Sequence, residues 1–189
     1  MLFRSSATLA FSAIQNNDKI GVIFFSDKIE KFIPPKKGRK HILYIIRELI
    51  DFKPESTRTN IQCAIEYLTN VQKKRCTAFM LSDFIDDHDF QNALTVANRK
   101  HDVVALQVYD RRMEELPDVG LLKLRDAETG HEQWVDTSSR AVRNAHHVWW
   151  MQRQEKLNGI FTHSNVDSVS VRTDQDYVKA LLNLFAKRN

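Results

Sequence analysis

Asp83 is the residue of this chain that is best placed to do chemistry, because it directly follows an apolar segment. Residues 76–82 read as a short apolar strand, and Asp86, Asp87 and Asp89 come next, before a helical pattern resumes. Open α/β folds build ion and ligand sites at the carboxyl ends of such strands. A carboxylate there offers the oxygen ligands that hard cations such as Mg²⁺ prefer. Asp83 is therefore a candidate metal ligand, with a solvated loop acid as the alternative.

Thr59 is the second candidate ligand. It lies in the hydroxyl-rich loop 56–60, which leads directly into a predicted helix. Residues 59–62, Thr-Asn-Ile-Gln, fit the capping box S/T-x-x-E/Q, and this predicts Thr59 as the helix N-cap. A threonine that caps a helix can still offer its oxygen to a metal ion, so both roles stay open.

A third group of chemically active side chains lies on one long helix. It consists of His146, His147, Trp149, Trp150 and Arg153. Adjacent histidines on a helix point about 100° apart, so they do not readily chelate one metal ion. We interpret this helix as a partner contact or as ordinary helix surface with a half-buried tryptophan.

Motifs of nucleophilic catalysis are absent from the sequence. The chain has no GxSxG elbow, no P-loop and no GxGxxG, and it contains only five glycines. We therefore predict that the chain is not an enzyme. The alternative is a metal-dependent phosphohydrolase that uses Asp83, Asp86 and Asp87 together with an upstream acid.

Length and composition favour one domain. The chain has 189 residues, 42% of them apolar and 28% charged, which is enough for one well-formed core. A net charge of +4 without a basic stripe gives no indication of nucleic-acid binding. No apolar run reaches the length of a membrane span, and the N-terminus has no signal-peptide core. We expect a single cytoplasmic domain over residues 1–189.

Helical and strand periods alternate along the chain. Such alternation predicts an α/β fold: a doubly wound, mostly parallel sheet with helices on both faces. The expected helices span residues 3–14, 42–50, 61–71, 90–97, 138–161 and 177–185; the expected strands span 19–25, 29–33 (ended by Pro34 and Pro35), 78–81, 103–108 and 166–171, with a hairpin at 121–124 and 133–135.

The first predicted element is a helix with no strand before it. Parallel strands are joined by crossover helices, so a helix that opens a doubly wound fold implies a strand upstream. We therefore expect the first central strand to be missing from this sequence, which would make the domain incomplete at its N-terminal end.

Characteristic strings lie at residues 9–14, 17–27, 32–38, 58–61, 81–84, 101–105, 108–110, 115–120, 126–130 and 173–178. The most specific of them are Leu116 to Gly120 and Asp126 to Gly130. Together, and in this order, they resemble the C-terminal half of the bacterial "domain of unknown function 58" family.

This resemblance implies a von Willebrand factor A-like fold with a metal-ion-dependent adhesion site. Such sites take a carboxylate and two serines from a DxSxS loop, a threonine from a second loop and an aspartate from a third. The matching positions for the last two are Thr59 and Asp83. The DxSxS loop would lie before helix 3–14, and Ser5-Ser6 has no preceding aspartate or strand to replace it. With two protein ligands, we expect Mg²⁺ or Mn²⁺ to be held only weakly.

The resemblance also implies a function. Full-length members resemble partners of MoxR-type AAA+ ATPases in the assembly or maturation of other proteins. We therefore predict a non-enzymatic protein-interaction module whose metal-dependent binding is weakened or lost by truncation. A non-functional gene fragment is the remaining alternative.

Overall fold

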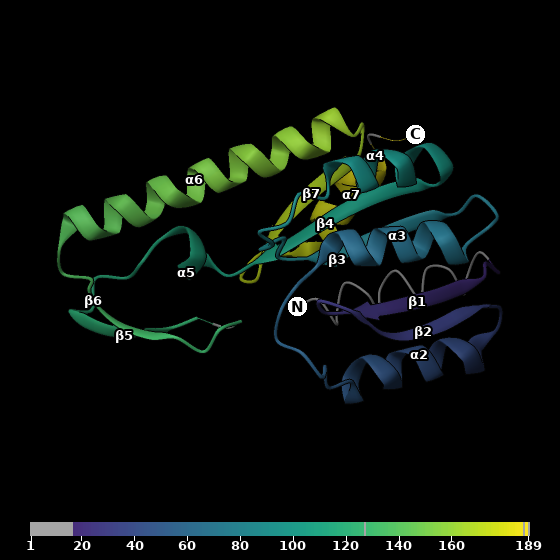
Figure 1. The fold of residues 1–189 in the computed structure, drawn as a ribbon, viewed down its shortest axis with the longest axis horizontal. Helices are drawn as coiled ribbons and strands as arrows, with labels where there is room; N and C mark the ends of the chain where they lie inside the picture. The colour runs from purple at the N-terminus through teal and green to yellow at the C-terminus, as the bar shows by residue number, and fades with distance from the viewer. Residues whose placement is uncertain (1–16, 127, 187, 189) are drawn as a thin grey trace.

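The structure is a computed structural model that describes residues 17–126, 128–186 and 188. The helix predicted over 3–14 lies outside the described residues. The remaining predicted elements are all present, with somewhat different ends (Figure 1). In chain order they are β1 Ile20–Phe25, β2 Ile29–Lys36, α2 Arg39–Asp51, α3 Ile61–Val71, β3 Thr77–Ser82, α4 Gln91–Lys100, β4 Asp102–Tyr109, α5 Arg111–Glu114, β5 Leu121–Arg125, β6 Glu132–Asp136, α6 Arg140–His163, β7 Asp167–Arg172 and α7 Tyr177–Ala186.

A three-stranded parallel sheet in the order β3-β4-β7 forms the centre of the fold. Alternate residues of β4 face opposite sides of this sheet. Val103 and Ala105 join a core with residues of α3, α4 and α6, whereas Val104 and Leu106 pack against Leu181 and other residues of α7. The prediction of an α/β fold with a parallel sheet and helices on both faces is therefore confirmed for this part of the chain.

The strands do not form the single sheet that the sequence predicts. They divide into three separate sheets, β1-β2, β3-β4-β7 and β5-β6, and the first and last are antiparallel hairpins. The physical reason is that, among the described residues, nothing pairs with the outer edge of β1 or of β3. A common core nevertheless links the first two sheets, because Phe25 of β1 packs against the cluster that contains Val103 and Ala105.

The two prolines do not end the second strand as predicted. β2 continues through Pro34 and Pro35 to Lys36, and a register irregularity lies between Ile20 and Val22 of its partner strand. Proline is tolerated at sheet edges and bulges, where its missing N–H is not needed. The backbones are so close here that a Cβ on Gly21 would lie 2.7 Å from the Ile33 carbonyl oxygen.

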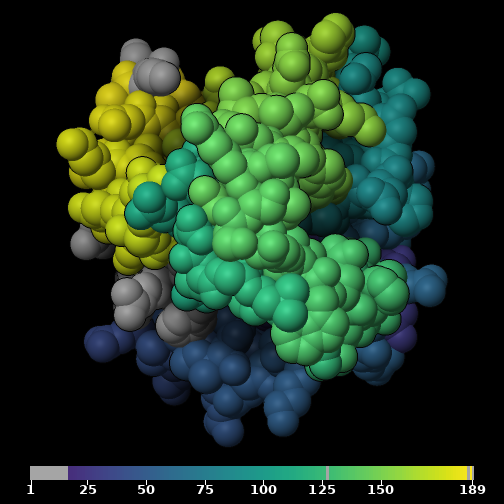
Figure 2. All heavy atoms as spheres, turned by 90° about the vertical axis from the view of Figure 1, so that its left-hand side faces the viewer, coloured from purple at the N-terminus to yellow at the C-terminus, as the bar shows by residue number. Residues whose placement is uncertain are grey.

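The β5-β6 hairpin and the 24-residue helix α6 follow β4 in the chain. Figure 2 shows them in green across the middle of one face of the molecule. The short helix α5, which the sequence did not reveal, precedes the hairpin. In the described residues no helix is both long enough and apolar enough to cross a membrane.

We predict that the core between α4 and the sheet supplies a large share of the stability. Leu94 is completely buried in it, so Leu94→Ala should lower the free energy of unfolding in urea by about 3 kcal/mol through lost contacts and a cavity. The control is Val96→Ala on the same helix, where the side chain is 54% exposed and the change should stay within about 0.5 kcal/mol. Equal losses in the two variants would contradict the assignment of this core.

Candidate functional site

The buried carboxylate of Asp86 ties the two candidate loops together. Its side chain is fully buried, and its Oδ2 accepts a hydrogen bond of 2.7 Å from the backbone N–H of Ile61, the first residue of α3. Its Oδ1 accepts from the backbone N–H of His88 at 2.9 Å and lies 2.6 Å from the same residue's Nδ1. A carboxylate at a helix N-terminus also interacts favourably with the helix dipole. The loop after β3 therefore anchors the start of α3.

Thr59 is not the N-cap that the sequence predicts. Asn60 takes this role, and its side-chain oxygen accepts the N–H of Cys63 at 2.9 Å. The Asn60 N–H in turn donates to the Ser26 carbonyl at 2.9 Å, which joins the loop to the end of β1. The predicted capping box was wrong because asparagine caps as well as threonine does. Within the described residues the partly buried Thr59 hydroxyl has no hydrogen-bond partner.

Asp83 lies directly after β3, as predicted, and its orientation is fixed by an unusual backbone. Its Oδ1 accepts the N–H of Ile85 at 3.1 Å. The next residue, Phe84, has φ 56°, a left-handed conformation that costs a residue of this size about 1–3 kcal/mol. Phe84 is nevertheless 3% exposed and packs edge-on against Phe161 of α6. The surrounding core therefore holds the turn that presents Asp83.

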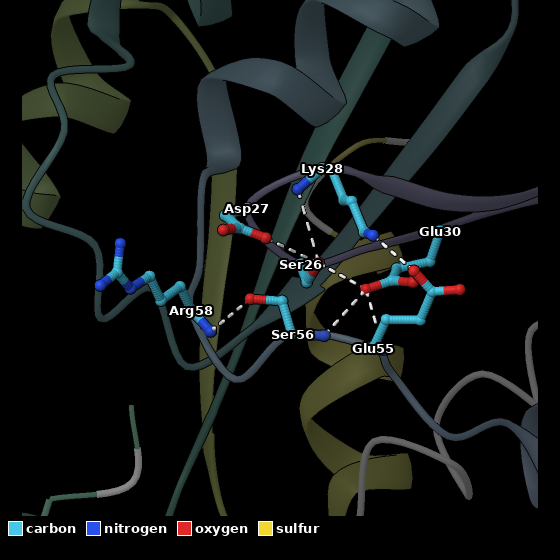
Figure 3. A network of polar contacts seen from close by, with 7 residues as sticks. All are labelled: Ser26, Asp27, Lys28, Glu30, Glu55, Ser56 and Arg58. Atoms are coloured by element: carbon cyan, nitrogen blue, oxygen red, sulfur yellow. Dashed lines mark hydrogen bonds and ion pairs between the residues drawn. The ribbon is translucent and has the colours of Figure 1, made fainter. Parts of the chain in front are cut away.

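A polar network at the end of β1 fixes the loop that carries Thr59 (Figure 3). The Glu30 carboxylate accepts hydrogen bonds from the Ser26 hydroxyl at 2.6 Å and from the backbone N–H groups of Glu55 and Ser56 at 3.1 and 3.3 Å. The Ser26 hydroxyl is the main cause that holds the pKa of Glu30 below its usual value. The Ser56 hydroxyl does the same for the pKa of Asp27. Both carboxylates thus stay ionised and bound in the folded loop.

The oxygens that could hold a metal ion make up only part of a site. Thr59 and Asp83 lie on loops that are joined through Asp86, but no hydrogen bond links these two residues directly. In the part of the chain that the structure describes, no group of three or more histidine, cysteine, aspartate or glutamate side chains is arranged for a metal. One free hydroxyl and one oriented carboxylate fit a hard cation as partial ligands, and the remaining ligands would have to come from elsewhere.

The acidic cluster behind the phosphohydrolase alternative does not present three converging carboxylates. Asp86 is committed to the start of α3, while Asp87 is exposed. Sequence reasoning missed the role of Asp86, because its partner Ile61 lies 25 residues away and no local pattern reveals the contact.

The histidine and tryptophan helix has a structural role. His146 Nε2 lies 2.9 Å from the Met113 carbonyl oxygen, and His147 Nδ1 lies 3.3 Å from that of Glu114, so α6 holds α5. Trp150 is 3% exposed and packs against Tyr109, so it belongs to the core. Trp149 is 45% exposed and is the half-buried tryptophan that the sequence predicts on this helix.

Comparison with known families identifies the chain. The family described as "Protein of unknown function DUF58" matches residues 1–156, which is most of the sequence. The chain belongs to the DUF58 family. The resemblance to this family predicted from the sequence is therefore confirmed.

Proteins similar to this chain occur in mycobacteria. An uncharacterized protein of Mycobacterium tuberculosis strain H37Rv is 27% identical over 191 residues, which cover 97% of this chain and 58% of that protein. An uncharacterized protein of Mycobacterium avium is 28% identical over 163 residues, which cover 82% of this chain and 93% of the relative. The chain thus spans little more than half the length of some curated relatives.

Solved structures share the fold. BatB from Bacteroides thetaiotaomicron, a conserved hypothetical protein, has a TM-score of 0.58 at 16% identity and covers 98% of this chain and 87% of its own. An aerotolerance-related membrane protein from Bacteroides fragilis has a TM-score of 0.60 at 17% identity, with 98% and 88% covered. At these identities the likeness concerns the fold alone.

We predict that Asp86 stabilises the protein through the start of α3. Asp86→Ala should lower the free energy of unfolding in urea by about 2 kcal/mol, because it removes the buried acceptor of the Ile61 N–H and leaves that N–H unpaired. The matched control, Asp87→Ala, changes an exposed acid one residue away and should cost less than about 0.5 kcal/mol. Similar losses in the two variants would remove Asp86 from this role.

We also predict that Glu30 makes the protein sensitive to acid. A carboxyl group whose pKa is lowered on folding stabilises the folded state above its unfolded pKa, here the ordinary 4.5, and this stabilisation is lost as pH falls through the lower folded pKa. The urea midpoint of the wild type should therefore fall between about pH 6 and about pH 3 by more than that of Glu30→Gln. Parallel curves for the two proteins would show that Glu30 makes no such contribution.

Proposed function

We propose that this DUF58 chain is a non-enzymatic protein-interaction module that binds its partner through a divalent cation. Thr59 and Asp83 would hold Mg²⁺ or Mn²⁺, and a carboxylate of the partner would complete the coordination shell. One observation carries the proposal: the carboxyl end of β3 presents an oriented Asp83 on a loop that Asp86 ties to the loop of Thr59, whose hydroxyl has no partner in the described residues. The bound cation would supply positive charge that attracts an acidic partner.

The fold that we propose is of the von Willebrand factor A type, with one further strand between β1 and β3. Two features support it. The outer edges of β1 and β3 are unpaired among the described residues, although Phe25 and the β4 residues share one core. In addition, β3 has no buried residue, whereas its neighbour β4 is buried from Val103 to Val108. Apolar strands of parallel sheets are usually covered on both sides, and the added strand would carry the DxSxS ligands.

The partner that we propose is a MoxR-type AAA+ ATPase, and the process is the assembly or maturation of other proteins. The support is the family resemblance carried by strings such as Leu116 to Gly120. An ATPase of this kind works where ATP is available, so we propose a cytoplasmic site of action for this single domain. Thr59 and Asp83 are both partly buried and lie on loops that Asp86 joins near the carboxyl end of β3, and the partner would have to contact them there.

We predict that divalent cations bind at Asp83 and Thr59. Calorimetry with Mn²⁺ on a version extended upstream by a DxSxS strand should give an affinity that falls by more than about tenfold in Asp83→Ala and in Thr59→Val, since each change removes a ligand oxygen. Asp87→Ala is the control, because this acid is exposed and lies beside the site without belonging to it. Unchanged affinity in Asp83→Ala would exclude the proposed site.

The same preparations decide between binding and catalysis. We expect no turnover of phosphate esters with Mg²⁺ or Mn²⁺, because Asp86 serves the fold. Turnover that depends on Asp83 would favour the phosphohydrolase instead. A cooperative thermal transition of the 189-residue chain would argue against a non-functional fragment.

A further inference from the structure

Gln107 is the one polar residue in the buried part of β4. The strand is otherwise apolar from Val103 to Val108, and Gln107 is only 2% exposed. A buried amide is costly unless its donors and acceptors are paired. This position therefore requires partners on the neighbouring strands. The parallel register supplies them, because Gln107 lies beside Ser82 of β3 and Ser170 of β7.

Each end of the Gln107 amide has a defined partner. Its Oε1 accepts a hydrogen bond from the Ser170 hydroxyl at 2.8 Å, and the orientation of the amide is set at the other end, where a backbone carbonyl can only accept. Its Nε2 then faces β3 and donates to the backbone carbonyl of Asp83 at 3.3 Å. A row of polar groups thus crosses the sheet from β7 to the residue that we propose as metal ligand.

The peptide that joins Asp83 to Phe84 is held at both of its polar groups. Gln107 binds the Asp83 carbonyl, and the Ser82 hydroxyl oxygen accepts the Phe84 N–H at 3.0 Å. This peptide leads into the left-handed conformation of Phe84, which few large residues adopt. With this peptide fixed, Oδ1 of the Asp83 carboxylate accepts the Ile85 N–H, and Oδ2 takes no part in that hydrogen bond.

We propose that Gln107 is a positioning residue for Asp83. Together with Ser82 and Ser170 it forms a clamp, named here the Asp83 clamp, in which Gln107 is buried, Ser82 is partly buried and Ser170 is exposed. This clamp orients the carboxylate toward a divalent cation. The effect of the clamp on cation binding rests on the proposed function. The hydrogen bonds of the clamp belong to the fold and do not depend on that proposal. Gln107 does not touch the cation in this account and acts only through the Asp83 backbone.

Nuclear magnetic resonance on the 189-residue chain tests the clamp without any metal. In Gln107→Leu, which keeps a similar volume, the Phe84 and Ile85 amides should exchange with solvent about tenfold faster, because the peptide loses one of its two anchors. Ser170→Ala should act in the same direction with a smaller effect, since it frees only the far end of Gln107. Val104→Ala is the control: it destabilises the same strand from a side chain that does not contact Asp83.

Mn²⁺ added to the same samples tests what the clamp does for binding. In the wild type we expect broadening of the Asp83 and Thr59 signals, with a several-fold higher Mn²⁺ concentration needed in Gln107→Leu and no shift in Val104→Ala. Exchange of Phe84 and Ile85 that stays at the wild-type rate in both Gln107→Leu and Ser170→Ala would overturn the clamp. Absence of broadening both in the wild type and in a version extended upstream by a DxSxS strand would refute the metal site and, with it, the positioning role, while the exchange rates would still decide whether the clamp exists.

Discussion

The hydrogen bond between the Asp86 carboxylate and the Ile61 N–H connects the loop after β3, which carries Asp83, to the start of α3, which follows the loop of Thr59. The arrangement of the candidate site depends on this connection. The hydrogen bond fixes where α3 begins, and therefore where the loop of Thr59 turns toward the sheet. Asp86 also belongs to the loop that begins with Asp83. Its backbone carbonyl oxygen accepts a hydrogen bond of 3.4 Å from the guanidinium of Arg153 on α6. Because the Asp86 side chain is fully buried, this contact is shielded from water and holds several elements in one arrangement.

The second constraint on the site is the packing of the β1-β2 sheet against the β3-β4-β7 sheet. The two sheets share a core, but no strand of one is hydrogen-bonded to a strand of the other. The packing of Phe25 against the cluster around Val103 holds β1 close to the β3-β4-β7 sheet, while the edges of β1 and β3 stay unpaired in the described residues. Unpaired edges of apolar strands favour pairing with another strand. Asp83 follows the carboxyl end of β3, and the loop of Thr59 is hydrogen-bonded to the end of β1 through Asn60 and Ser26. In the fold that we propose, a strand between β1 and β3 would therefore bring its own loop to Thr59 and Asp83.

Much of the fold could be predicted from the sequence, because β4 and the amphipathic helices have strong apolar periods. The contacts that build the site could not, because they join residues far apart: Ile61 with Asp86, and Asp83 with Gln107. The capping residue was misassigned by one position, since both Thr59 and Asn60 are good caps and only the backbone decides between them. Gln107 did leave a trace in the sequence, as the one polar residue in an apolar strand, and such a residue calls for a partner. The left-handed conformation of Phe84 could not be predicted from the sequence, because a phenylalanine rarely adopts it.

The most direct test of the account is the position of the cation itself. Crystals of this chain, alone and extended upstream, can be grown with Mn²⁺ and examined by anomalous scattering. The account predicts a peak at roughly 2.0 to 2.5 Å from an Asp83 carboxylate oxygen, with the Thr59 hydroxyl in the same coordination shell and higher occupancy in the extended protein. A peak bound elsewhere, or an Asp83 carboxylate that binds no Mn²⁺ in either crystal, would contradict it.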